Sequence, residues 1–340
     1  MKPVVLISTP FGPESHSGNW RTAARYAALL ESSGFLARLM VGQGTEDAWL
    51  GVDAAIVLHA RRSHAVATRA RERHIPYAVV LTGTDIYGDL GAQGVPAHAA
   101  MCIETIQGAI LAVALQQEAA RALKERCAAM AGVVCPEVVT IRQATPWSVQ
   151  PDAHREGATR CIMVGHVRAE KDPETGVKGF LIAQSQQPGL RLVHVGGSLD
   201  DALMGRLKAM QDQYSDAFQL QGMVSHDEVR RWMDQSDVLI HPSQSEGGAL
   251  VLGEAVARGL YVLASDIPGN VGVLGPSYPG YFEVGKPEAL SGLLLQLQYD
   301  QVLRARLSEA TSKLRMTLCD PLAEARALDS VVQRLLVSRP

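Results

Sequence analysis

Short runs of apolar residues alternate along the chain with longer segments that have the spacing of amphipathic helices. In the first half, runs rich in Val, Ile and Leu predict strands, and segments rich in Ala, Leu and Arg predict helices. The predicted strands are 3–9, 35–41, 53–59, 77–82, 108–113 and 137–142, and the predicted helices are 19–34, 63–74 and 116–130. This alternation is typical of a mostly parallel sheet with helices on both faces.

The alternation is interrupted at residues 144–158, which contain two prolines and few apolar residues, and it then restarts. Further strands are predicted at 161–166, 191–197, 218–222, 237–242 and 261–265, and the tail from Leu290 is expected to be helical. We therefore expect an α/β protein with two Rossmann-like domains and a cleft between them. The expected domains are 1–150 and 151–320, followed by a helix at 321–340 that packs back on the N-terminal domain.

The composition excludes several classes of protein. Of 340 residues, 47 % are hydrophobic and 20 % are charged, as in ordinary globular proteins. The net charge of −3 gives no positive field that would attract nucleic acid or anionic lipid. No apolar run approaches the roughly 20 residues that span a bilayer, and the apolar stretch before Ser8 is too short for a signal peptide. The five cysteines form no C-x-x-C pair. We expect a cytoplasmic protein without a nucleic-acid or membrane partner.

The segment 241–259, HPSQSEGGALVLGEAVARG, has the strongest chemical signal. A predicted strand ends at His241, a loop rich in Ser and Gly follows, and a helix is expected to begin near Ala249. The free amides at the N-terminus of such a helix can bind a diphosphate. Glu246 precedes the helix and Glu254 lies about one turn inside it, so both carboxylates could accept hydrogen bonds from sugar hydroxyls. The plainer interpretation is that both glutamates are solvated.

This segment resembles the nucleotide-sugar site of retaining GT-B glycosyltransferases, in which the first Glu contacts the donor sugar and the second contacts the ribose. In that family an Arg and, five residues later, a Lys hold the donor diphosphate after another strand. In CIMVGHVRAEKDP (161–173), Lys171 stands at the Lys position, but His166 stands at the Arg position. The resemblance implies the catalytic residues Glu246, Arg168 and Lys171, and the donor-binding residues His166, Gly247, Gly248, Ala249, Leu250 and Glu254.

Six segments together resemble a narrower family, the selenosugar synthases of selenoneine biosynthesis. They are residues 18–30, 58–63, 81–87, 164–173, 241–249 and 266–282. The resemblance implies a GT-B enzyme that joins selenophosphate to C1 of a UDP-sugar, expected to be UDP-N-acetylglucosamine, with release of UDP and phosphate. We expect no cofactor and no metal, because the chain has no D-x-D sequence and no histidine pair at i, i+4 beside a carboxylate. Cationic side chains and helix-end amides would stabilise the leaving group.

Selenophosphate carries an anionic, polarisable selenium, so its site needs cations more than it needs a general base. Ligands bind at the carboxyl ends of parallel strands, and several polar residues are predicted there in the N-terminal half. The expected acceptor-binding residues are Gly18, Asn19, His59, Arg61, Arg62, Thr84 and Asp85. The alternatives are that the arginine pair is surface charge on the helix near 63–74 and that Asp85 caps a turn.

The sequence leaves the roles of two other histidines open, and it has three alternative functional interpretations. His241 is either a site residue or a buried strand-end residue, and His16 lies in a Gly/Ser loop that could close over the cleft. A glycosyltransferase with an ordinary hydroxyl acceptor would keep the same donor site. A two-lobed module that binds sugar nucleotides without catalysis is the non-enzyme alternative. A dinucleotide dehydrogenase is disfavoured because no predicted strand leads into G-x-G-x-x-G.

Overall fold

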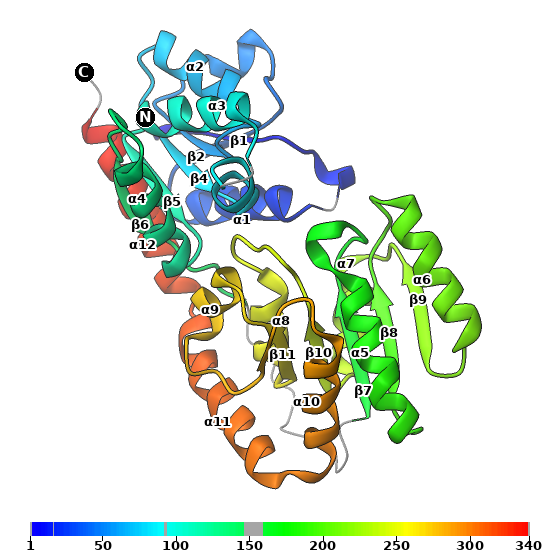
Figure 1. The fold of residues 1–340 in the computed structure, drawn as a ribbon. Helices are drawn as coiled ribbons and strands as arrows, with labels where there is room; N and C mark the ends of the chain where they lie inside the picture. The colour runs from blue at the N-terminus through cyan, green and yellow to red at the C-terminus, as the bar shows by residue number, and fades with distance from the viewer. Residues whose placement is uncertain (1, 16, 92–93, 146–158, 339–340) are drawn as a thin grey trace. The chain divides into compact units, whose positions relative to one another are not determined.

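The computed structural model describes residues 2–15, 17–91, 94–145 and 159–338, and these form two compact units (Figure 1). Unit 1 runs to Gln143 and also includes the chain from Pro321 onward, and unit 2 runs from Ala144 to Asp320. The segment expected to separate the domains, 144–158, lies outside the described residues from position 146 onward.

Unit 1 is built on a six-stranded parallel sheet with the strand order β2-β1-β3-β4-β5-β6. The strands are β1 (Val4–Thr9), β2 (Leu36–Val41), β3 (Ala54–Leu58), β4 (Tyr77–Leu81), β5 (Leu111–Ala114) and β6 (Glu137–Thr140). Its helices are α1 (Gly18–Ser32), α2 (His64–Glu72), α3 (Pro96–Gln107), α4 (Gln117–Ala129) and α12 (Pro321–Val337). β3 and β4 are buried along their whole length, which explains their uninterrupted apolar sequences.

The two faces of this sheet carry separate hydrophobic clusters, because successive side chains of a strand point to opposite faces. Leu6 and Val57 belong to the cluster that α2, α3 and α4 cover. Val5 and Ile56, each one position earlier in its strand, belong to the cluster that α1 and α12 cover. The sheet of unit 1 is therefore a middle layer between two layers of helices.

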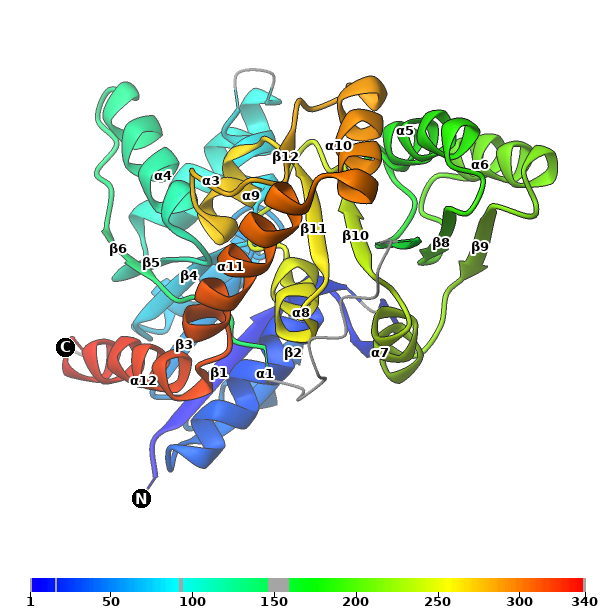
Figure 2. The ribbon, with the colours of Figure 1, turned by 90° about the horizontal axis from the view of Figure 1, so that it is seen from below.

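Helix α12 belongs to unit 1 although the whole of unit 2 precedes it in the chain, and it lies beside α1 (red and blue in Figure 2). Leu328, Val331, Val332 and Leu335 recur at helical spacing and pack in the second of these clusters. An ion pair fixes the helix further, since Nη2 of Arg25 on α1 lies 2.5 Å from Oε2 of Glu324. The Glu324 side chain is fully buried.

Arg25→Ala is expected to lower the free energy of unfolding by about 3 kcal/mol, because it leaves a buried carboxylate without its guanidinium partner. Urea denaturation measures the loss. Arg334→Ala on α12 is the matched control, because its partner Glu137 is exposed and exposed ion pairs contribute little. Equal losses in the two variants would contradict the importance of burial for the Arg25–Glu324 pair.

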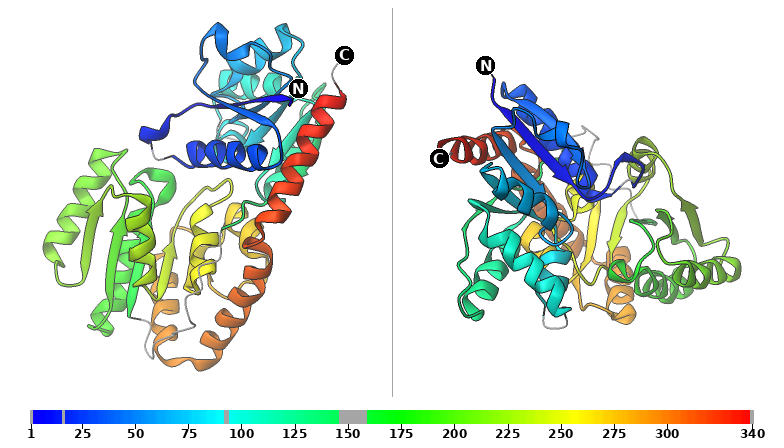
Figure 3. Two further views of the ribbon diagram at one scale, coloured as in Figure 1. Left: turned by 180° about the vertical axis from the view of Figure 1, so that it is seen from behind. Right: turned by 90° about the horizontal axis from the view of Figure 1, so that it is seen from above.

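Unit 2 contains a second six-stranded parallel sheet, with the order β12-β11-β10-β7-β8-β9. Its strands are β7 (Arg160–Val164), β8 (Arg191–Val195), β9 (Phe218–Gly222), β10 (Val238–His241), β11 (Tyr261–Ser265) and β12 (Tyr281–Phe282). Its helices are α5 (Pro173–Gln186), α6 (Asp201–Gln213), α7 (His226–Asp234), α8 (Leu250–Arg258), α9 (Pro268–Leu274), α10 (Pro287–Tyr299) and α11 (Gln301–Leu318). Helices α5, α6 and α10 cover one face, and α7, α8 and α11 cover the other (Figures 2 and 3).

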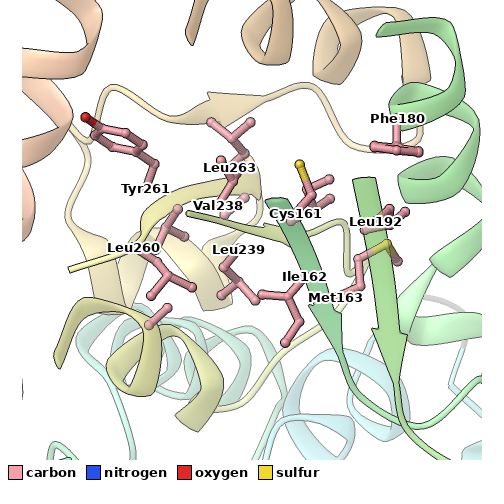
Figure 4. Close-up of a cluster of buried hydrophobic side chains, with 14 of the residues drawn as sticks. Cys161, Ile162, Met163, Phe180, Leu192, Val238, Leu239, Leu260, Tyr261 and Leu263 are labelled. Atoms are coloured by element: carbon pink, nitrogen blue, oxygen red, sulfur yellow. The ribbon is translucent and has the colours of Figure 1, made fainter. Parts of the chain in front are cut away.

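The core of unit 2 is centred on neighbouring strands of this sheet (Figure 4). Ile162 of β7, Leu239 of β10 and Leu263 of β11 are fully buried, and Phe180 of α5 is also fully buried in this core. Burial of one such side chain stabilises the fold by roughly 1.5–3 kcal/mol. This packing fixes the ends of β7 and β10, from which two loops emerge side by side.

Each sheet has a point where the direction of strand order reverses. In unit 1 the chain moves outward from β1 to β2 on one side and to β3 on the other. In unit 2 it moves from β7 to β8 and β9, and then returns to the other side of β7 with β10. Open parallel sheets bind ligands at the carboxyl ends of the strands that flank such a switch point. The topology therefore marks one edge in each unit as a candidate site.

The predicted α/β architecture with two Rossmann-like domains is confirmed, and every predicted strand has a counterpart within a few residues. The elements that were not predicted include α3, the two-residue β12, and a π-helical turn, η3 (Thr84–Asp89). The strand predicted at 108–113 is displaced, because α3 continues to Gln107 and β5 begins at Leu111. Gln107 and Gly108 mark the end of the helix, but residues 109–114 are apolar throughout, so the sequence does not show which of them begins the strand.

Candidate functional site

The switch point of unit 2 brings together two loops that are far apart in the sequence. The loop after β7 leads into a 3-10 turn, η4 (Ala169–Lys171), and the loop after β10 leads into α8. Nζ of Lys171 in the first loop lies 2.5 Å from Oε1 of Glu246 in the second. Both residues are among the predicted site residues, and the structure joins them directly.

Glu246 is a buried carboxylate with two partners on the same oxygen. Besides Lys171, Nε2 of His241 at the end of β10 lies 3.1 Å from Oε1 of Glu246. Burial raises the pKa of the Glu246 carboxyl, but Lys171 and His241 outweigh burial and hold this pKa well below its usual range. Glu246 is therefore ionised at any physiological pH, which suits a group that stabilises positive charge or accepts hydrogen bonds.

His241 and His194 line one small pocket at the carboxyl ends of β10 and β8, together with Lys171 and Ser243. Burial, together with the charge of Lys171, lowers the pKa of His241 by more than Glu246 raises it. Burial, followed by the charge of His166, lowers the pKa of His194 to about 4. Both rings are therefore neutral near pH 7, and Lys171 is the only side chain with a formal positive charge that lines this pocket.

The loop between β10 and α8 is held in an unusual backbone conformation. Ala249 caps α8 with a φ of +29°, which is uncommon for a residue with a side chain. Gly269 of α9 packs so close that an added Cβ would lie 2.3 Å from the carbonyl oxygen of Glu246. Helix α8 begins at Leu250, one residue later than predicted, and the amides of Gly248, Ala249 and Leu250 lie at its N-terminus.

The remaining predicted donor-side residues lie around these loops. Glu254 is buried in α8, and Nε2 of His226 at the start of α7 lies 3.6 Å from its carboxylate. Arg168 caps η4 and is partly exposed, with its Nε 4.0 Å from Glu170. His166 is half-buried in the loop after β7. Gly247 is buried between Glu246 and the start of α8.

The switch point of unit 1 contains a second group of predicted residues. His59, at the end of β3, has a φ of +70° and lies 3.0 Å from Oγ1 of Thr84 through Nε2. Asp85 is fully buried and accepts hydrogen bonds from the backbone amides of Ala60, Thr82, Gly83 and Ile86. Asp85 therefore organises this turn, as the turn-cap alternative anticipated, and Thr84 is its partly exposed neighbour.

Arg61 and Arg62 lie in the turn before α2 and not on the helix itself. Nε of Arg61 donates a hydrogen bond of 2.8 Å to Asp89 of η3, and the Arg62 guanidinium lies 4.8 Å from the centre of the Phe11 ring. The pair therefore sits at the carboxyl ends of β1 and β3. The two other predicted residues, Gly18 and Asn19, form the start of α1, which the side chain of Ser17 caps.

The glycosyl transferases group 1 family matches residues 148–314, which include the Lys171, Glu246 and Glu254 positions. The match covers just under half of the chain and lies almost entirely within unit 2. The chain is 27 % identical over 179 residues to the GtfA subunit of a UDP-N-acetylglucosamine–peptide N-acetylglucosaminyltransferase from Streptococcus pneumoniae serotype 4, which is 50 % of this chain and 35 % of that protein. It is 35 % identical over 106 residues to the gpi3 subunit of a phosphatidylinositol N-acetylglucosaminyltransferase from Schizosaccharomyces pombe, which is 31 % and 22 % of the two chains. The chain thus spans about a third or less of these relatives.

Solved structures resemble the chain over almost its full length. Sucrose-phosphate synthase from Thermosynechococcus elongatus has a TM-score of 0.81 and 16 % identity, and the match covers 99 % of this chain and 100 % of that one. HepE from Anabaena, in complex with UDP and glucose, has a TM-score of 0.76 and 13 % identity, with 98 % and 100 % covered. These similarities confirm the predicted GT-B fold.

Four contacts around the two switch points were not predicted from the sequence. Each involves a residue distant in the chain or in another turn: His241 beside Glu246, His226 beside Glu254, Asp89 beside Arg61 and Phe11 beneath Arg62. Of these contacts, only the one made by His241 had a signal in the sequence. His241 is a polar residue at the end of a predicted strand, directly before Pro242, but this position left its role open. His16 lies outside the described residues.

Among the residues that the structure describes, no group of three or more His, Cys, Asp or Glu could hold a metal ion. Within the same residues, no helix combines the length and the apolar character that crossing a membrane requires.

Proposed function

We propose that this protein is a group 1 glycosyltransferase that transfers N-acetylglucosamine from UDP-N-acetylglucosamine to selenophosphate and thereby makes a 1-selenosugar. The main support for a UDP-sugar donor is the cluster of Lys171, Glu246 and His241 beside the N-terminus of α8. The acceptor half rests on the resemblance to selenosugar synthases and on the cations at the switch point of unit 1. The fold and the donor site do not depend on the identity of the acceptor.

The donor assignment combines an anion site with two carboxylates. The ammonium of Lys171, the guanidinium of Arg168 and the amides at the start of α8 would bind the diphosphate. Glu254, farther along α8, would accept hydrogen bonds from the ribose. The relatives support this donor class, since GtfA belongs to a UDP-N-acetylglucosamine–peptide N-acetylglucosaminyltransferase and its crystal structure contains UDP and GlcNAc.

Glu246 is proposed to act on the sugar. Its carboxylate is ionised and fixed by Lys171 and His241. As the bond between C1 and the diphosphate oxygen breaks, positive charge develops at C1 and the ring oxygen. A fixed negative charge near that centre stabilises the transition state more than the ground state.

The acceptor assignment rests on charge. Selenophosphate presents anionic oxygens and an anionic selenium, so it needs orientation and charge neutralisation more than a general base. Arg61 and Arg62 supply planar donor groups that match such oxygens, and Thr84 and the start of α1 add hydrogen-bond donors. Selenium attacks C1, UDP leaves with the bonding electrons, and hydrolysis of the Se–P bond by water then releases phosphate.

UDP release from a panel of UDP-sugars, measured with and without selenophosphate, tests the proposal. We expect the fastest release with UDP-N-acetylglucosamine, and we expect it to depend on selenophosphate and not on added alcohols or sugars. If turnover depends instead on a hydroxyl compound, that compound is the acceptor and selenophosphate is not, while the assignment of the donor site stands. Ligand-dependent thermal stabilisation without any UDP release would favour a binding module without catalysis.

Lys171→Gln and Glu254→Gln are each expected to weaken UDP binding by about 10- to 150-fold, because each removes a charge-assisted contact of roughly 1.5–3 kcal/mol. Isothermal titration calorimetry measures the affinities. Lys313→Gln is the matched control, since Lys313 forms an exposed pair with Glu309 on α11 at 2.6 Å. Unchanged UDP affinity in both site variants would overturn the donor assignment.

A further inference from the structure

Two side chains compete for one oxygen at the centre of the donor site. Oε1 of Glu246 lies 2.5 Å from Nζ of Lys171 and 3.1 Å from Nε2 of His241. The side chains of Glu246 and His241 are 8 % and 3 % exposed, whereas that of Lys171 is 20 % exposed. Lys171 therefore reaches Glu246 from the more open side, and His241 reaches it from the interior.

The proposed function, on which this inference rests, requires Lys171 for a second task. A bound diphosphate carries negative charge and attracts the same ammonium group that pairs with Glu246. When Lys171 turns toward the phosphates, the buried Glu246 carboxylate loses much of its compensating charge. A buried carboxylate without a cationic partner costs several kcal/mol, so another group must compensate.

We propose that His241 takes over from Lys171 as the charged partner of Glu246 when a UDP-sugar binds, and that it takes up one proton from solvent in doing so. His241 is then a positioning residue, because it keeps the Glu246 carboxylate ionised and in place at the sugar. With one ring proton on Nε2 toward Glu246, the incoming proton adds to Nδ1. The ring becomes an imidazolium and the protein gains one positive charge.

The surrounding charges favour this direction of change. Besides burial, which lowers the pKa of His241, two charged groups act on this ring: Glu246 raises the pKa, and Lys171 lowers it. His194 lines the same pocket, but its pKa of about 4 keeps it neutral. Removing the influence of Lys171 while Glu246 stays ionised therefore raises the pKa of His241.

The sign of the pH dependence follows from the proton count. The complex holds one more proton than the free protein, so affinity for the UDP-sugar falls as pH rises between the lowered pKa of free His241 and its higher pKa in the complex. In this window the dissociation constant increases by up to about tenfold per pH unit. Below and above the window it does not depend on His241.

The probe is UDP-N-acetylglucosamine without acceptor, because both of its phosphates are esterified and do not titrate near neutral pH. Calorimetry in buffers of different ionisation enthalpy gives the number of protons taken up. We expect uptake approaching about one proton per bound ligand inside the window, and a shift of the His241 ring nitrogens to imidazolium values in spectra of isotope-labelled protein. His241→Gln retains an amide donor for Glu246 but cannot titrate, so its uptake should fall close to zero.

His74→Asn is the matched control, because His74 is exposed and its left-handed backbone (φ +55°) suits asparagine. It should take up protons as the native protein does. Full uptake in His241→Gln, or neutral His241 nitrogens in the native complex, would overturn the inference while leaving the donor site intact. A failure of UDP-N-acetylglucosamine to bind the native protein would instead overturn the proposed function together with the inference.

Discussion

Glu246→Gln is expected to lower kcat for UDP release by about 100- to 1,000-fold, the range seen when one preorganised electrostatic group is removed from an active site. The substitution keeps the size of the side chain but removes the ionised carboxylate that Lys171 and His241 hold in place. Affinity for UDP should stay the same or increase, because Lys171 is then available to the diphosphate. Steady-state kinetics and calorimetry measure the two quantities.

A glutamate from the same unit supplies the control. Glu309 also pairs with a lysine, Lys313, at 2.6 Å, but this pair is exposed on α11. Glu309→Gln should leave both kcat and UDP affinity near native values. If Glu246→Gln instead binds UDP poorly and turns over normally, Glu246 contacts the nucleotide and the proposed roles of Glu246 and Glu254 are exchanged.

Replacing both Arg61 and Arg62 by alanine is expected to raise the KM for selenophosphate by about 100-fold or more, or to abolish turnover. Each arginine offers a charge-assisted contact of roughly 1.5–3 kcal/mol to an anionic acceptor. Asp89 orients Arg61, and Arg62 lies over the Phe11 ring, so neither side chain is simply solvated. A selenophosphate titration at saturating UDP-sugar measures the effect, and UDP affinity should not change.

The matched double variant is Arg69→Ala with Arg71→Ala, in the last turn of α2. These arginines pair with exposed glutamates and lie away from the end of β3, so KM should remain near native. If the rate of the Arg61/Arg62 variant depends on selenophosphate concentration in the same way as the native rate does, these two arginines do not bind the acceptor. We would then assign the acceptor site to Asn19 and the turn at Thr82–Asp85.

The strands were predictable because each sheet is parallel and covered on both faces. β3 and β4 are wholly buried and read as unbroken apolar runs, a local property that needs no knowledge of the partner strands. The boundary between α3 and β5 was not predictable in this way. There the chain becomes apolar immediately after Gly108, the C-cap of α3, and tertiary packing decides where in this run the strand begins.

The candidate site was predictable in its parts but not in its contacts. Lys171 and Glu246 could each be placed after a strand, yet they are 75 positions apart and meet only because β7 and β10 are neighbours in the sheet. The role of His241 was ambiguous because it, too, depends on a contact that the sequence does not show. Its pairing with Glu246 depends on how the loop after β10 folds back, which Gly269 permits by its close approach. The pairing of Asp89 with Arg61 was also not predictable, because Asp89 lies in η3, a turn that the sequence did not indicate.

The position of α12 has a consequence for protein synthesis. Val5, Ile7 and Ile56 leave the ribosome early, but α12, which completes their apolar layer, is translated only after all of unit 2. At roughly 5–20 residues per second, the intervening segment takes about 10–35 s to make. During that interval the nascent first sheet keeps an apolar strip uncovered while unit 2 emerges with all of its own strands. The unit at the start of the chain is thus the last to acquire its complete core, and a chaperone would find its binding surface there.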